Sequence, residues 1–168
     1  LGYKVAERVH LPAMVLLDGF YLSHTSEPVN LPSEEEVDSF LPPYKPAYSL
    51  DPDDPTHVGG LAPDDYMEMR YMMHESMLEA IEVYREECAL FHKQFGRGYK
   101  ALEPYRCHDA EVIVVTAGTI SGTARVAIDR CRDDGIPVGR LKFRMFRPFP
   151  HEEVRAALKD CRRIAVID

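Results

Sequence analysis

The chain has 168 residues, of which 45% are hydrophobic and 29% are charged, and its formal net charge is −8. This composition is typical of a folded globular protein, and an acidic chain without a dense basic cluster is not expected to bind nucleic acid. No apolar run approaches the roughly 20 residues that cross a bilayer, and the first ten residues lack the apolar stretch of a signal peptide. We therefore expect a cytoplasmic protein without membrane contact.

The N-terminal residues predict the end of one α/β unit. Apolar residues within positions 3–9 recur at helical spacing. After Pro12, the apolar run 13–17 predicts a strand that ends at Asp18-Gly19-Phe20. This pattern is typical of the end of a helix whose beginning is absent, so we expect the chain to be part of a longer polypeptide.

Three polar residues, Ser23, His24 and Thr25, follow this predicted strand. Loops at the carboxyl ends of parallel strands are where ligands and partner surfaces usually meet, so these residues are candidates for a cofactor, substrate or subunit contact. The alternative is that they satisfy backbone groups in a tight turn, as Ser and Thr commonly do. A Ser-His-Asp hydrolase is disfavoured because adjacent Ser and His align poorly and no GxSxG motif is present.

The middle of the chain predicts two helices separated by a proline-rich connector. Ser33 and Glu36 form a capping box at the start of a short helix that Pro42-Pro43 ends. The longest helical pattern covers residues 64–95, before Gly96. Its apolar stripe is predicted to pack as core, the alternative being a flexible binding face. The stripe consists of Met69, Met73, Met77, Ile81, Tyr84, Cys88, Phe91 and Phe95.

The C-terminal residues 109–168 predict a strand, helix, strand, helix, strand order. The strands are expected within 109–118, over 138–143 and over 164–167, and this order is typical of a parallel sheet with right-handed crossovers. The chain stops directly after the third strand, so we expect further sheet in a longer polypeptide.

Two features of this C-terminal region carry candidate chemistry. Gly118 and Thr119 open the turn into the first helix, where backbone N–H groups suit a phosphate. The turn matches neither GxGxxG nor a P-loop, and a small-residue turn packed against a neighbouring domain explains it equally well. Arg140, Lys142 and Arg144 share one side of the second strand. That side cannot be a dry core unless acids meet it, so we expect it to face a rim or another subunit.

The four cysteines are widely separated, and no two lie at a CxxC spacing. Zinc and iron–sulfur ligand sets are excluded by that spacing. Cys131 and Cys161 fall on the apolar faces of predicted helices, where a free thiol packs as a small hydrophobic side chain. The histidines and carboxylates are scattered, so the residues predict no metal site and no complete catalytic site.

Several short motifs resemble one known family, in that family's order. Asp18-Gly19-Phe20 with Ser23-His24-Thr25, Phe95-Gly96-Arg97 with Tyr99, and Phe146-Arg147-Pro148-Phe149-Pro150 resemble stretches of the α subunit of pyruvate:ferredoxin oxidoreductase and its relatives. Asp109-Ala110-Glu111 and the turn at Gly118 resemble its next domain. The resemblance implies a thiamine-diphosphate enzyme that oxidatively decarboxylates pyruvate or a related 2-oxoacid to an acyl-CoA and passes electrons to ferredoxin.

The resemblance also implies a domain organisation within an α/β fold of parallel or mixed sheets with flanking helices. Residues 1–60 would close a pyrimidine-binding domain and its connector, 61–104 would hold a long linker helix, and 105–168 would begin a Rossmann-like domain similar to the transketolase C-terminal domain. Thiamine diphosphate and Mg would bind at an interface with other domains or subunits, and the iron–sulfur clusters would lie in partner subunits. The expected partners are a diphosphate-binding subunit and an iron–sulfur subunit.

The segment alone would then bind no cofactor, hold no catalytic residue and show no activity, serving mainly as a scaffold and subunit interface. Its candidate cofactor or interface contacts are Ser23, His24, Thr25, Gly118 and Thr119. The alternative function is a stand-alone α/β nucleotide-binding or regulatory module that uses the Gly118 turn.

Overall fold

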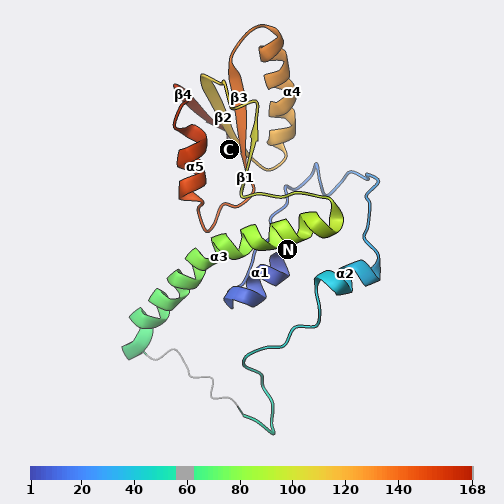
Figure 1. Cartoon of the computed structure of the whole chain (residues 1–168), viewed down its shortest axis with the longest axis vertical. Helices are drawn as coiled ribbons and strands as arrows, with labels where there is room; N and C mark the ends of the chain where they lie inside the picture. The colour runs from blue at the N-terminus through green and yellow to red at the C-terminus, as the bar shows by residue number, and fades with distance from the viewer. Residues whose placement is uncertain (56–62, 168) are drawn as a thin grey trace. The chain divides into compact units, whose positions relative to one another are not determined.

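A computed structural model of the chain describes residues 1–55 and 63–167 (Figure 1). The chain forms two compact units. The first contains residues 1–15 and 29–98, and the second contains residues 16–28 and 99–168. The chain therefore enters the second unit briefly near its N-terminus and returns to it after Gly98. Within the described residues, no helix is long and apolar enough to span a membrane.

The first unit is helical. Its elements are α1 (Gly2–Val9), α2 (Glu34–Phe40), the 3₁₀ helix η1 (Pro63–Asp65) and α3 (Tyr66–Phe95). Val9 of α1 is buried against Ala80 and Val83 of α3, with Val5 and Leu11 packed beside them. The helix predicted from the apolar spacing of residues 3–9 is confirmed, and it covers part of α3.

A buried carboxylate also joins α1 to α3. Glu87 is only 3% exposed, its Oε2 lies 2.8 Å from the Lys4 ammonium, and its Oε1 accepts a hydrogen bond from Arg8 Nη1 at 3.0 Å. Burial acts to raise the pKa of Glu87, but donation by Lys4 and Arg8 outweighs it and the pKa lies below its ordinary value. The two cations therefore keep Glu87 ionised inside the helix pair.

The capping box predicted for the short helix is confirmed. Ser33 Oγ accepts from the Glu36 amide, and the Glu36 carboxylate accepts from the Ser33 amide. At the other end of α2, Phe40 meets Phe91 and Phe95 edge-on, with ring centroids 5.3 and 5.5 Å apart. This aromatic contact attaches α2 to the C-terminal end of α3.

The second unit is a four-stranded mixed sheet with helices on its two faces (Figure 1). Its elements are β1 (Leu102–Tyr105), β2 (Val112–Ala117), α4 (Ile120–Asp133), β3 (Val138–Phe143), α5 (His151–Leu158) and β4 (Arg163–Ile167). The strand order is β1-β3-β2-β4, with β2 parallel to β3 and β4, and β1 antiparallel to β3. The predicted α/β class with flanking helices is confirmed.

The two faces of this sheet have different chemistry. On one face, Leu102, Ile113 and Leu141 form a core that α5 covers through Val154 and Leu158. Alternate strand residues point to the opposite face, where α4 packs over a buried hydrogen bond of 2.9 Å between the hydroxyls of Thr116 and Ser121. α4 also buries Ile128, so its side of the sheet combines polar and apolar contacts, whereas the α5 face is apolar.

Two predictions about apolar stretches are wrong. Residues 13–17 form no strand, and Met14 and Leu16 are 86% and 80% exposed, because no described strand lies beside them to complete their hydrogen bonds. The methionine stripe of α3 is only partly core, since α1 is eight residues long and α3 is 30. Met69 and Met73 are exposed, while the buried face is Ala80, Val83, Glu87 and Cys88.

β1 was not expected, because residues 99–108 carry no strand pattern. The predicted domain boundaries at residues 60 and 104 stay predictions, and the first lies within residues 56–62, outside the described residues.

Candidate functional site

A loop of the second unit is attached to the turn between β2 and α4. The Thr119 amide donates to Asp18 Oδ2 at 2.5 Å, and the Thr119 hydroxyl donates to the same oxygen. Gly118 has a φ of 63°, and a Cβ there would lie 2.5 and 2.6 Å from the two Asp18 carboxylate oxygens. Glycine is therefore required at 118 both for backbone conformation and for space.

The Asp18 carboxylate occupies the N-terminal end of α4, where backbone N–H groups favour an anion. Donation by the Thr119 hydroxyl, and then by its amide, lowers the pKa of Asp18 below its ordinary value, with a further contribution from Lys142. The predicted phosphate position is thus filled by a carboxylate of the same chain. A role of Gly118 and Thr119 in cofactor or interface contact stays a prediction.

The three polar residues of the same loop make contacts within their own turn. Ser23 Oγ and His24 Nδ1 are 2.8 Å apart, and the Thr25 hydroxyl donates to the Tyr21 carbonyl at 2.5 Å. The His24 ring lies 5.1 Å from the Phe20 ring. Ser23, His24 and Thr25 are exposed, so their side chains are accessible from solvent, and their role in cofactor or subunit contact stays a prediction.

Asp18 is the residue of this site that the sequence patterns did not mark as functional. The structure brings it together with Gly118 and Thr119, 101 positions from Thr119 along the chain. The sequence feature that could have marked Asp18 is its place directly after the apolar run 13–17 and before Gly19.

A buried arginine lies under α4, close to this edge of the sheet. Arg140 is 3% exposed, donates to the Ser121 carbonyl at 2.9 Å and pairs with Glu103 Oε1 at 2.7 Å. Arg144 pairs with the other Glu103 oxygen at 2.7 Å. Burial acts to raise the pKa of Glu103, but the two arginines lower it below its ordinary value. This side of β3 was expected to face a rim or another subunit unless acids met it, and Glu103 of β1 is such an acid.

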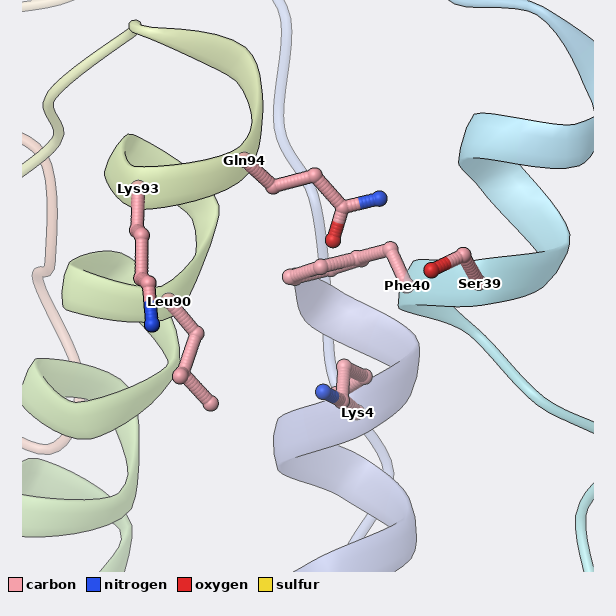
Figure 2. A pocket seen from close by; sticks show the side chains of 6 residues that line it. All are labelled: Lys4, Ser39, Phe40, Leu90, Lys93 and Gln94. Atoms are coloured by element: carbon pink, nitrogen blue, oxygen red, sulfur yellow. The ribbon is translucent and has the colours of Figure 1, made fainter.

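The described part of the chain holds no group of three or more His, Cys, Asp or Glu side chains that could bind a metal ion. The four cysteines are free. A hollow of about 380 Å³ lies in the first unit. Figure 2 shows the side chains that line it, which are Lys4, Ser39, Phe40, Leu90, Lys93 and Gln94. Lys4 contacts the Phe40 ring at 4.4 Å and pairs with Glu87. No carboxylate or histidine is among the described residues that line the hollow, so it presents no acid–base pair for catalysis.

Replacing Asp18 by alanine is expected to release the loop from the Gly118 turn. The Thr119 amide then loses its acceptor, so hydrogen exchange should become several-fold faster at residues 118–121 and across 16–28, while β3 stays protected. Hydrogen–deuterium exchange of the complete subunit measures this. As a control, Asp54→Ala removes an exposed carboxylate elsewhere and should change nothing at residue 119. Unchanged exchange at Thr119 in Asp18→Ala would show that the contact does not hold the loop.

Comparisons with known proteins agree with this architecture. The family described as "Pyruvate flavodoxin/ferredoxin oxidoreductase, thiamine diP-binding" matches residues 1–88, and "Pyruvate:ferredoxin oxidoreductase core domain II" matches residues 110–168. A solved 2-oxoglutarate:ferredoxin oxidoreductase from Magnetococcus marinus has a similar fold, with a TM-score of 0.51 and 16% identity over 80% of this chain and 22% of that chain.

Three relatives align over this whole chain. The pyruvate synthase subunits PorA of Methanothermobacter thermautotrophicus and Pyrococcus abyssi are 47% and 48% identical, over 45% and 44% of their own lengths. The ketoisovalerate oxidoreductase subunit VorA of Pyrococcus horikoshii is 43% identical over 43% of its length. The chain thus spans less than half the length of these curated relatives. It belongs to the pyruvate flavodoxin/ferredoxin oxidoreductase family, in agreement with the resemblance of its motifs.

Proposed function

We propose that the chain is a segment of the α-type subunit of a thiamine-diphosphate-dependent 2-oxoacid:ferredoxin oxidoreductase, which oxidatively decarboxylates pyruvate or a related 2-oxoacid to an acyl-CoA. The family matches cover residues 1–88 and 110–168, and the aligned relatives are pyruvate synthase and ketoisovalerate oxidoreductase subunits. These relatives favour the oxidoreductase over a stand-alone nucleotide-binding module.

Within that enzyme, the proposed role of this segment is structural. The observation that carries this role is the Asp18–Thr119 contact, because the chain's own carboxylate takes the position that a bound phosphate would need. Thiamine diphosphate with Mg would then bind at an interface with a diphosphate-binding subunit, and the iron–sulfur clusters would lie in a partner subunit. Ser23, His24 and Thr25 are the exposed residues that we propose for contact across such an interface.

We also propose the partners, the cellular location and the domain bounds of this segment. Ferredoxin is the proposed electron acceptor and CoA the acyl acceptor. We propose a cytoplasmic location, which suits a chain whose four cysteines are free. We also propose that residues 1–60 close a pyrimidine-binding domain, 61–104 link, and 105–168 begin a transketolase-like domain.

The test uses the complete subunit assembled with its partner subunits. We expect ferredoxin reduction that depends on CoA, on thiamine diphosphate and on a 2-oxoacid, with pyruvate, 2-oxoisovalerate and 2-oxoglutarate compared as substrates. The subunit without its partners should show no turnover. Turnover by the isolated subunit, or no activity of the complete assembly with any 2-oxoacid, would contradict the proposal.

A further inference from the structure

The N-terminal half of α3 carries apolar side chains on two sides. Met69 and Met73 continue the side that meets α1 further along the helix, and both are exposed. Met67, Tyr71 and Leu78 share a second side, at spacings that place residues on one helix face, and Met67 and Tyr71 are 79% and 64% exposed. A helix that is apolar around its circumference is normally covered on more than one side.

A hollow lies along the helix surface from this second side toward the first. Its volume is about 480 Å³, and its lining consists of Tyr71, Met72, Glu75, Ser76, Leu78 and Glu79. An aromatic ring, a thioether and a leucine form apolar walls, and two carboxylates stand beside them. The hollow is therefore suited to an apolar side chain that has cationic neighbours.

The two carboxylates of the hollow differ in their charge pairing from the acids in the C-terminal half of α3. Glu82 pairs with Arg85 at 2.6 Å, and Glu86 pairs with Arg8 at 2.7 Å. Glu75 and Glu79 are exposed, and neither belongs to an ion pair among residues 1–55 and 63–167. They are one helical turn apart, where like charges repel, so an approaching cation stabilises both.

We propose that this α3 surface, formed by Tyr71, Met72, Glu75, Ser76, Leu78 and Glu79, docks a partner subunit through a segment with an apolar anchor flanked by Lys or Arg. The inference rests on the proposed function, since it names a contact that assembles that enzyme. A second copy of this chain does not fit, because two-fold packing of the same surface would set Glu75 and Glu79 against the same carboxylates of the other copy.

The first test reverses the charges in the complete subunit, co-purified with its partner subunits. Glu75→Lys with Glu79→Lys should weaken partner binding by about tenfold or more, because favourable rim charges become repulsive. Glu75→Gln with Glu79→Gln should weaken it less, and wild-type binding should weaken as salt rises. Glu34→Lys with Asp38→Lys is the matched control, since these exposed carboxylates are also one turn apart, on α2. Its binding should be unchanged.

The second test does not depend on tolerance of the charge reversal. A photo-crosslinking residue at Ser76 should capture a partner-subunit peptide that contains Lys or Arg beside an apolar residue. Capture of a peptide from this subunit's own chain, from a second copy, or of none in an assembled complex would overturn the inference. Equal partner binding by the charge-reversed and wild-type subunits would also overturn it, and an active wild-type assembly would then leave the proposed function standing. A wild-type assembly without 2-oxoacid activity would overturn the proposed function instead.

Discussion

Replacing Gly139 by alanine is expected to destabilise the sheet by about 3 kcal/mol or more, at the upper end of the range for overpacking a core. A Cβ at this position of β3 would lie 2.6 Å from the Arg106 carbonyl oxygen and 2.9 Å from Cys107 Cα. These are backbone atoms, so no side-chain rotation relieves the contact. The Arg106 carbonyl is further fixed by a 2.7 Å hydrogen bond from Arg132 Nη2.

Gly122 provides the matched control for this substitution. A Cβ at Gly122, within α4, has no other atom within 4 Å. Gly122→Ala should therefore stabilise the unit by up to about 1 kcal/mol through its higher helix propensity. Hydrogen–deuterium exchange of peptides covering 138–143 in the complete subunit reports both changes, as faster exchange for Gly139→Ala and as equal or slower exchange for Gly122→Ala. Similar protection in the two variants would show that the chain segments around residue 106 can move apart.

Elements with a strong local pattern were predictable from the sequence. The strand expected over 138–143 has those bounds in the structure, and the capping box at Ser33 forms with both of its hydrogen bonds. In each case the information is local, because strand and helix patterns depend on residues a few positions apart. The antiparallel strand β1, which makes the sheet mixed, could not be predicted from its sequence because it is short and contains Pro104.

β1 forms a strand because it pairs with β3. Leu102 to Tyr105 pair with Phe143 to Arg140 in antiparallel register, so Pro104 lies in an edge strand, where a missing N–H is tolerated. Conversely, the apolar run 13–17 has a strand pattern but no described neighbour to pair with. The pattern shows that these residues favour burial and leaves open which surface covers them.

For the candidate site, the sequence predicted the turn at Gly118 but not which residue contacts it. The strand before Gly118 correctly placed the turn into α4 at the end of an element, whereas the run before Asp18 forms no strand. That Asp18 and Thr119 bond to one another follows from tertiary folding, because 101 positions separate them. The helix N-terminus was expected to attract an anion, and the anion is the chain's own carboxylate.

Replacing Glu103 by leucine is expected to cost about 3 kcal/mol, near the lower end for breaking a buried ion pair, because the Glu103 side chain is itself partly exposed. The variant leaves the Arg140 guanidinium buried under α4 with the Ser121 carbonyl as its remaining described acceptor, and its Nε already has no partner among the described residues. Urea denaturation monitored by hydrogen exchange in β1 and β3 of the complete subunit measures the loss.

Acidification should produce part of the same effect in the wild type. Since folding lowers the pKa of Glu103, the stabilisation is fully present above its unfolded value, about 4.3, and is lost as the pH falls through the lower folded value. Glu103→Leu should lack this component of the acid response. An unaltered acid response in the variant would place the pH dependence in other carboxylates.

Two further variants distinguish the contribution of the buried Arg140 from that of the partly exposed Arg144. Arg144→Met removes the partly exposed partner of Glu103 and should change stability by about 1 kcal/mol or less, as exposed pairs do. Arg140→Met in the Glu103→Leu background removes the uncompensated cation, so the double variant should be more stable than Glu103→Leu alone. The opposite result, a double variant less stable than Glu103→Leu, would contradict this expectation. Arg140 would then stabilise the fold mainly through its hydrogen bond to the Ser121 carbonyl of α4, rather than through its pairing with Glu103 of β1.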